Sequence, residues 1–248
     1  MRKGAFSTGS LLVAALLGGV PFAFSCAPRD QEAAAAARAA EWATIERERA
    51  ALDGLRAELA AAREQDASAT PELETRVGHS TDRFLERLVA FINQHAGARE
   101  PNGTAKAAPE LAAAIRMKSS EDLLLAREYI ERGGDYAKAI DILASAEVVD
   151  PDNSELVAAR AEAERLRYMD QERFARVEKG MTEDDVRAEL GQVKQQNVRE
   201  ETGQVVWLYP RENGAAAAVF FRAGREGVLA VDDTNFEAVP SPTDGPPG

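Results

Sequence analysis

The chain has 248 residues and a formal net charge of −12, from 42 acidic and 30 basic side chains. This charge argues against a nucleic-acid partner, because phosphate binding needs a positively charged surface. The length suffices for one or two small domains with appendages, and the single cysteine excludes an internal disulfide bond. The sequence carries no glycine-rich phosphate loop and no metal-ligand cluster, so it predicts neither an enzyme nor a cofactor.

The first 28 residues have the composition of an export signal. Two basic residues, Arg2 and Lys3, precede the apolar run 11–24, which is shorter than the roughly 20 residues that a membrane-spanning helix needs. The run leads into Ala23-Phe24-Ser25-Cys26, which resembles the lipobox of bacterial lipoproteins. In such proteins signal peptidase II cuts before a cysteine that carries lipid.

This resemblance implies a signal peptide over residues 1–25 and lipidation at Cys26, the sole cysteine of the chain. It implies an outer-membrane lipoprotein that faces the periplasm and is attached to the membrane through its lipid. Two alternatives stay open. Ordinary secretory cleavage would leave a soluble periplasmic protein, and an uncut segment would leave an inner-membrane anchor.

Residues 26–66 are predicted to form a helical spacer after the lipid. The stretch 30–64 is rich in alanine, glutamate, arginine and leucine and has no proline, which indicates a long helix. Ile45, Leu52 and Leu59 stand seven residues apart, as in a coiled coil. The alternatives are therefore a coiled coil, with a homo-oligomer formed through residues 41–62, and a solvated single helix.

Residues 67–107 are predicted to hold one amphipathic helix, at 81–95, between two breaks. Its broad apolar face must meet either residues 30–64 folded back or another subunit. His79 and His95 are the only histidines and lie sixteen residues apart, which is no metal-ligand spacing, so both are expected at the surface. The apolar face consists of Phe84, Leu85, Leu88, Val89, Phe91 and Ile92.

Residues 108–169 are predicted to form a helical domain. A helix over 108–117 leads into two further helices that fold back on each other. Gly133-Gly134 breaks the first of these, because glycine adopts positive φ easily. Asp135 can cap the second helix, and Asp150-Pro151 ends it, because proline cannot continue a helix.

Small and aromatic residues of this hairpin stand at the offsets of a tetratricopeptide repeat: Gly134, Tyr136, Ala139, Ala146 and Pro151. The stretch 134–153 resembles the second half of that unit, while the first half carries Arg127 where a small residue is usual. The resemblance implies one repeat, at about 120–153, with a concave protein-binding surface that includes Tyr136 and Arg127. One repeat cannot bury its own apolar face, so residues 154–166, capped by Ser154, are expected to close it.

Residues 170–239 change in character and predict a small α+β domain. Thr182 and Asp185 can form a capping box at the start of a helix over 183–190, which Gly191 ends. Three strand-like runs follow, at 205–209, 215–222 and 228–231. Asn213-Gly214 between the first two predicts a type I′ hairpin turn. With a helix before residue 182, the order is ααβββ.

Short motifs of this domain resemble the SmpA/OmlA (BamE) family of outer-membrane lipoproteins in the β-barrel assembly machinery. They are Gly180-Met181-Thr182, Leu190-Gly191, Trp207-Leu208-Tyr209 and Phe220-Phe221. The resemblance implies a non-enzymatic interaction domain at the outer membrane. Strand alternation sends Trp207 and Tyr209 to one face and Phe220 and Phe221 to opposite faces. These aromatics are interpreted as core plus one exposed ring, or alternatively as a docking patch for a protein partner.

The fold class expected for the whole chain is α+β, with a mostly helical N-terminal part before the small domain. Residues 240–248 are predicted to be a disordered tail by composition. The order of anchor, spacer and two binding-type modules predicts a lipid-anchored periplasmic adaptor that binds other proteins, in outer-membrane assembly or envelope maintenance. One alternative is an inhibitor or ligand sensor that acts through the C-terminal domain. Another is a purely structural envelope spacer.

Overall fold

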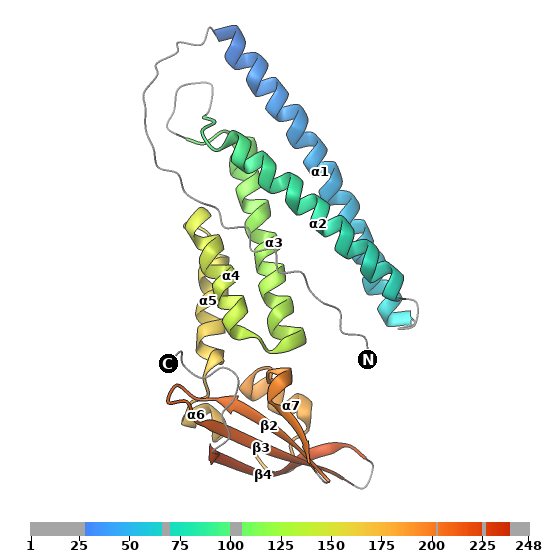
Figure 1. Cartoon of the computed structure of the whole chain (residues 1–248), viewed down its shortest axis with the longest axis vertical. Helices are drawn as coiled ribbons and strands as arrows, with labels where there is room; N and C mark the ends of the chain where they lie inside the picture. Colours follow the sequence, from blue (N-terminus) through green and yellow to red (C-terminus); the bar gives the residue numbers. More distant parts are fainter. Residues whose placement is uncertain (1–27, 66–69, 100–105, 202, 225–226, 239–248) are drawn as a thin grey trace.

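The computed structural model describes residues 28–65, 70–99, 106–201, 203–224 and 227–238 (Figure 1). Helices make up the N-terminal part, and a small antiparallel sheet with short helices follows, so the α+β prediction is confirmed. The predicted signal peptide, Cys26 and the predicted tail at 240–248 lie outside the described residues.

Helices α1 (Pro28–Gln65) and α2 (Thr70–His95) pack side by side as a long hairpin (Figure 1). The long helix is therefore confirmed, and the apolar face of α2 meets α1 folded back. Helix α2 covers the apolar seam at 41–62 that was predicted for a homo-oligomer. A homo-oligomer stays a prediction, and it would have to form through another surface. The buried residues of this seam are Trp42, Ile45, Leu52, Phe84, Leu88 and Phe91.

Helix α2 begins eleven residues before the predicted start at Thr81. Pro71 does not prevent this, because proline is tolerated in the first turn, where its missing N–H has no partner to lose. Gly78 within the helix has open space around it. The expected break at 65–71 is thus shorter than the sequence indicated.

The helical hairpin of the predicted repeat is confirmed as α3 (Pro109–Gly133) and α4 (Tyr136–Val149). Gly134 has φ 60° and donates its N–H to the carbonyl of Ile130 at 2.8 Å, which ends α3. The Asp135 side chain accepts from the N–H of Lys138 at 3.2 Å and caps α4 as predicted. The two helices meet through buried residues that include the predicted small ones: Leu123, Ala126, Ala139, Leu143 and Ala146.

Helix α5 (Ser154–Arg167) closes the hairpin, as expected. Its cap is Asn153 and not Ser154, because the Asn153 amide oxygen accepts from the N–H of Glu155 at 3.1 Å while Ser154 is already helical. Leu156 is buried in the same cluster as residues of α3 and α4, and Ala163 is also buried. Val157, the residue after Leu156, is exposed.

The C-terminal domain begins with two short helices, α6 (Gln171–Phe174) and α7 (Glu183–Leu190), and a 3-10 turn at Gln195–Asn197. The sheet follows in the order β1 (Val198–Glu201), β2 (Gln204–Pro210), β3 (Ala216–Ala223) and β4 (Leu229–Ala238), all antiparallel. The prediction of three strands misses β1, whose sequence VREE has one apolar residue and no alternation that would mark a strand.

The Asn213-Gly214 hairpin is confirmed, but its turn is not type I′. A type I′ turn needs positive φ at both central residues, and only Gly214, at 78°, has it, since no described residue other than glycine has positive φ. Gly214 donates to the carbonyl of Arg211, and the Asn213 side chain accepts from the N–H of Ala215. The loop is one residue longer, with glycine in the left-handed position.

Strand alternation places Trp207, Tyr209 and Phe221 on the sheet face that α6 and α7 cover. The Trp207 and Phe221 rings pack with centroids 4.6 Å apart and planes tilted by 54°, and the Arg187 guanidinium lies over the indole. Phe220 lies half-buried on the opposite face. Three of the four aromatics are thus buried in the core, and Phe220, the one expected to be exposed, is half-buried.

Candidate functional site: a clamped helical framework with an exposed apolar end

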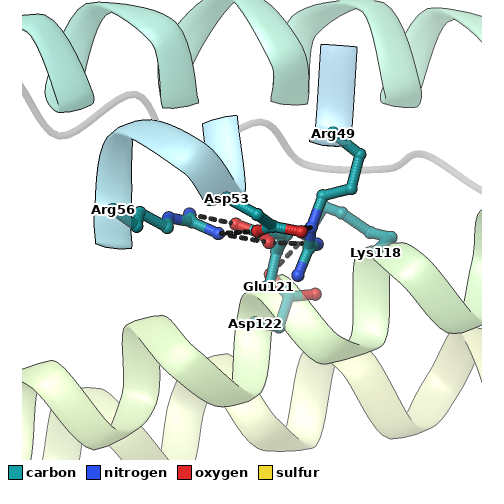
Figure 2. A network of polar contacts seen from close by, with 6 residues as sticks. All are labelled: Arg49, Asp53, Arg56, Lys118, Glu121 and Asp122. Carbon is teal, nitrogen blue, oxygen red and sulfur yellow. Dashed lines mark hydrogen bonds and ion pairs between the residues drawn. The ribbon is translucent and has the colours of Figure 1, made fainter. Parts of the chain in front are cut away.

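A buried carboxylate joins α1 to α3 (Figure 2). Glu121 of α3, with its side chain 3% exposed, faces two arginines of α1. Arg56 binds it with both terminal nitrogens, at 3.0 and 2.7 Å, and Arg49 donates to the same carboxylate. Asp53 of α1 accepts from the Arg49 Nε at 2.9 Å. We call these four residues the charged clamp.

The clamp balances two positive charges with two negative ones, which is the arrangement that lets charges be buried. The hydrogen bond to Glu121 raises the pKa of the Arg56 guanidinium above its ordinary value. Two-pronged arginine–carboxylate pairs are among the stronger polar contacts and fix orientation as well as distance. The clamp therefore holds α1 in one register against α3.

A second set of polar contacts ties the three helices at their other end. Arg38 of α1, which is buried, donates to Glu110 of α3 at 3.0 Å. The Nε2 atom of His95 lies 3.1 Å from Glu41, and the His95 ring packs on Phe91 with centroids 4.6 Å apart. The prediction that His95 is a surface residue is therefore corrected, because its side chain is only 16% exposed.

The helical hairpin and the C-terminal domain interlock at the start of α4. The Tyr136 hydroxyl accepts the backbone N–H of Gln192 at 2.8 Å. Gly134 packs so closely on the segment 191–194 that a Cβ atom there would lie 2.5 Å from the carbonyl oxygen of Val193. Tyr209 of β2 donates its hydroxyl to the carbonyl of Gly191 at 3.3 Å. Two parts that the sequence treats as separate modules are thus joined through one tyrosine and one glycine.

Three of the four residues predicted to bind a protein partner are buried. Trp207 is 1% exposed in the domain core, and Tyr136 and Tyr209 lie at the junction just described. Burial raises the pKa of both tyrosine hydroxyls above the ordinary value. Their side chains contact residues of this chain, so the idea of an aromatic docking patch on the sheet is corrected. Arg127 of α3 is the exposed member of the set.

Exposed apolar side chains lie instead on α3, α4 and α5, at the α4–α5 turn end of α4 and α5 and inside the length of α3. Five of the six large apolar side chains that the described residues expose belong to these helices, and the sixth is Val228. We call the five the apolar end of the repeat. They are Leu124, Leu125, Val148, Val149 and Val157.

Hydrogen bonds at the α4–α5 turn bring these helices together. The Asp150 carboxylate accepts from the Ser119 hydroxyl of α3 at 2.8 Å and from the Asn153 amide at 3.0 Å. The apolar end lies within about two helical turns of these bonds, or roughly 11 Å along each helix. Val148 is 82% exposed, the largest exposed fraction among the five. The signals in the sequence were the pairs Leu124-Leu125 and Val148-Val149, which one helix face cannot bury together.

Two kinds of site do not occur in the described part of the chain. There, no group of three or more histidine, cysteine, aspartate or glutamate side chains is placed to hold a metal ion. None of the helices in the described ranges combines the length and the apolar character that crossing a bilayer requires. The candidate site is the exposed apolar end on the clamped framework.

Comparison with known proteins adds no assignment: no family model, no curated protein and no solved structure matches the chain. The likenesses to a tetratricopeptide repeat and to the SmpA/OmlA family accordingly stay predictions from sequence motifs.

Proposed function

We propose that this protein is a lipid-anchored scaffold of the cell envelope that binds other proteins and catalyses no reaction. The anchor is Cys26, attached to the outer membrane on its periplasmic side. The helical repeat supplies the binding surface, and the interlocked C-terminal domain supports it or binds a second partner. The resemblance to a lipobox supports the compartment, and the resemblance to a tetratricopeptide repeat supports the class of activity, which is protein binding.

One observation carries the proposal: five of the six large apolar side chains that the described residues expose lie on α3, α4 and α5. Apolar side chains scattered singly over a surface need no explanation, but a local concentration of them indicates a contact with another molecule. Arg127, one helical turn after Leu124, would add a charged group beside this surface. Arginine beside apolar side chains is a frequent combination in protein interfaces.

The framework explains why such a surface would keep its shape. The charged clamp holds α1 to α3, and the Tyr136 junction holds α4 to the C-terminal domain. A partner that contacts the apolar end would therefore meet a preformed surface, which lowers the conformational cost of binding. The same junction joins the C-terminal domain to the repeat, as the proposal requires. The alternative of an inhibitor or sensor needs only an isolated C-terminal domain.

The test places a charge at the apolar end without weakening the fold. Val148→Lys changes the most exposed apolar side chain, and a cation in the last turn of α4 is compatible with the helix dipole. Val228→Lys is the matched control, because Val228 is also exposed but lies in the C-terminal domain. Both variants should be as stable as the wild type.

Partners are cross-linked in intact cells and identified by mass spectrometry for the wild type and both variants. The proposal expects one set of partners to be lost with Val148→Lys and kept with Val228→Lys. If the two variants keep the same partners as the wild type, the apolar end is not the binding surface. If the wild type has no partners above background, the scaffold function itself is wrong.

A further inference from the structure

A small cavity lies at the junction between the helical repeat and the C-terminal domain. Its volume is about 10 Å³, which is about the space that one water-sized atom needs. Helices α4 and α5 line it on one side, and the segment after α7 lines it on the other together with β2. We call it the junction cavity. Its polar members are Tyr136, Arg167, Gln192, Lys194 and Tyr209.

Two hydrogen-bond donors of this cavity have no acceptor in the described part of the chain. The Nε atom of Arg167, the last residue of α5, is buried and makes no hydrogen bond. The Tyr136 hydroxyl, on a side chain only 5% exposed, accepts from the N–H of Gln192. Its own O–H is a donor as well, and no described residue accepts from it. Buried donors rarely stay unpaired in folded proteins, so these two indicate an acceptor on a bound molecule.

The positive charge of Arg167 is also unbalanced. Its guanidinium lies 4.9 Å from the ring centre of Tyr168, and no carboxylate of the described residues pairs with it. Three other cations near the cavity do have acidic partners, at 2.6, 3.6 and 3.8 Å: Arg165 with Glu162, Lys194 with Asp135, and Arg173 with Asp170. A shortage of acids is not the reason, since the chain has 42 acidic and 30 basic side chains. An anion in the cavity would balance the charge of Arg167.

We propose that the junction cavity binds a carboxylate, which belongs either to a small organic acid or to the C-terminus of a peptide. One carboxylate oxygen can accept from both the Arg167 Nε–H and the Tyr136 O–H, and hydrogen bonds between a guanidinium and a carboxylate are among the stronger ones. The cavity has room for one oxygen atom, so the rest of the molecule stays outside, beside Lys194, whose side chain is 14% exposed. This inference does not depend on the scaffold function.

The bound carboxylate would join two parts of the molecule. Arg167 ends α5 and Tyr136 begins α4, whereas Gln192 and Lys194 belong to the C-terminal domain. A ligand that binds only while these elements are together stabilises the folded protein, and the effect grows with the ligand concentration. Carboxylate binding should therefore raise the free energy of unfolding.

The experiment follows the Nε–H resonance of Arg167 by NMR in the full chain, at constant ionic strength. Acetate and the peptide tri-alanine are the two probes, and acetamide is the neutral control of the same shape as acetate. Arg167→Gln removes the guanidinium, and Arg167→Lys keeps the charge without the Nε–H. Arg165→Gln is the matched control, because the Arg165 side chain is 56% exposed and pairs with Glu162. Urea unfolding of each protein shows that it is folded.

The proposal expects a saturable shift with acetate and none with acetamide. Resonances of the neighbouring segment 191–194 report binding in the variants. Acetate should bind about 10- to 100-fold more weakly to Arg167→Gln, which is the worth of a hydrogen bond to a charged group, more weakly to Arg167→Lys as well, and normally to Arg165→Gln. Tighter binding of tri-alanine than of acetate identifies a peptide terminus as the ligand, and the reverse order identifies a small acid.

Three results would overturn the proposal. If the wild type responds equally to acetate and acetamide, or to neither, the cavity holds water and no carboxylate. If Arg167→Gln binds acetate as the wild type does, the site lies elsewhere. If Arg165→Gln loses as much affinity as Arg167→Gln, acetate is attracted by positive charge in general and the junction cavity is not a specific site.

Discussion

Replacing Gly134 by alanine tests the junction between the helical repeat and the C-terminal domain. Gly134 combines a left-handed backbone, at φ 60°, with a very close approach to another segment. The added Cβ atom would lie 2.5 Å from the carbonyl oxygen of Val193 and 2.7 Å from the backbone nitrogen of Lys194. Both neighbours are backbone atoms, which cannot rotate away as the end of a side chain can.

The loss of stability follows from two contributions. The left-handed conformation costs an alanine about 1–2 kcal/mol relative to glycine. Carbon atoms in ordinary contact stay about 3.5 Å from their neighbours, so the segment 191–194 must withdraw by roughly 1 Å. This movement would break the hydrogen bond between Tyr136 and Gln192, which is worth about 0.5–1.5 kcal/mol. The expected loss in the free energy of unfolding is about 2–4 kcal/mol.

Two neighbouring glycines serve as controls. Gly133 is the last residue of α3, and a Cβ there meets nothing within 4 Å, so Gly133→Ala should stabilise the protein by about 0.5–1 kcal/mol through helix propensity. Gly214 has φ 78° and equally open surroundings. Gly214→Ala should therefore cost only the conformational part, about 1–2 kcal/mol.

The free energies are measured by urea unfolding, with helical circular dichroism and tryptophan fluorescence as separate probes. The two tryptophans, Trp42 in α1 and Trp207 in β2, report on different parts, so Trp42→Phe isolates the signal of the C-terminal domain. A Gly134→Ala protein no less stable than the Gly214→Ala protein would show that Gly134 and Val193 are not in contact.

Three further variants address other contacts. Tyr136→Phe removes the acceptor of the Gln192 N–H and should lower the free energy of unfolding by about 1–3 kcal/mol, because a buried donor loses its partner. Glu121→Gln removes the charge that two arginines share and should cost about 1–3 kcal/mol, measured by urea unfolding and accompanied by faster amide exchange in α1. Thr182→Ala removes a helix cap and should cost about 0.5–2 kcal/mol. Hydrogen bonds from the Thr182 backbone and hydroxyl hold the pKa of Asp185 below its usual value, so this carboxylate stabilises the fold above its unfolded pKa of about 3.9, and the contribution is lost as pH falls through the lower folded pKa.

Controls for these variants come from the same structure. Tyr129→Phe in α3 changes a tyrosine outside the junction, and Glu128→Gln removes a carboxylate whose ion pair with Arg132 is exposed and of small worth. Asp184→Asn is the control for the pH dependence, because Asp184 lies on the same turn without accepting from Thr182. If Asp185→Asn leaves the acid side of the stability curve unchanged, the hydrogen bonds do not shift the carboxyl group.

The local elements were predictable from sequence because each carries its own chemical signal. Gly134 and Asp135 at the α3–α4 corner and Thr182 with Asp185 at the start of α7 act within a few residues of themselves. What the apolar face of α2 packs against was predictable only as one of two alternatives, because such a face fits another subunit as well as a folded-back helix.

The contacts over long distances were not predictable in the same way. Nothing near Glu121 in the sequence signals that Arg49 and Arg56, more than sixty residues earlier, will enclose it. Tyr136 looked like a binding residue because its pattern describes a repeat that usually has neighbours. In this chain the C-terminal domain occupies the adjacent space, and its Gln192 N–H donates a hydrogen bond to the Tyr136 hydroxyl.

The adjacent apolar pairs indicate that some side chains are exposed, but the sequence does not show which ones. Val148 and Val157 fit helical patterns as well as the buried positions beside them, and only packing decides which of them faces a neighbour. Strand β1 was missed for a similar reason, because its pairing with β2 and not its composition makes it a strand. The candidate site was therefore identified from the burial of side chains in the structure, whereas most of the helices and strands that form it were predicted from the sequence pattern.

The measurement that tests the central claim most directly is co-purification from native membranes of the wild type and of Cys26→Ala, with partners quantified by mass spectrometry. The scaffold account predicts that the wild type fractionates with the outer membrane and brings down envelope proteins, and that Cys26→Ala loses both the membrane fraction and those partners. Equal recovery of one soluble enzyme with both forms would contradict it, because anchoring would then be incidental and inhibition of that enzyme would be the activity.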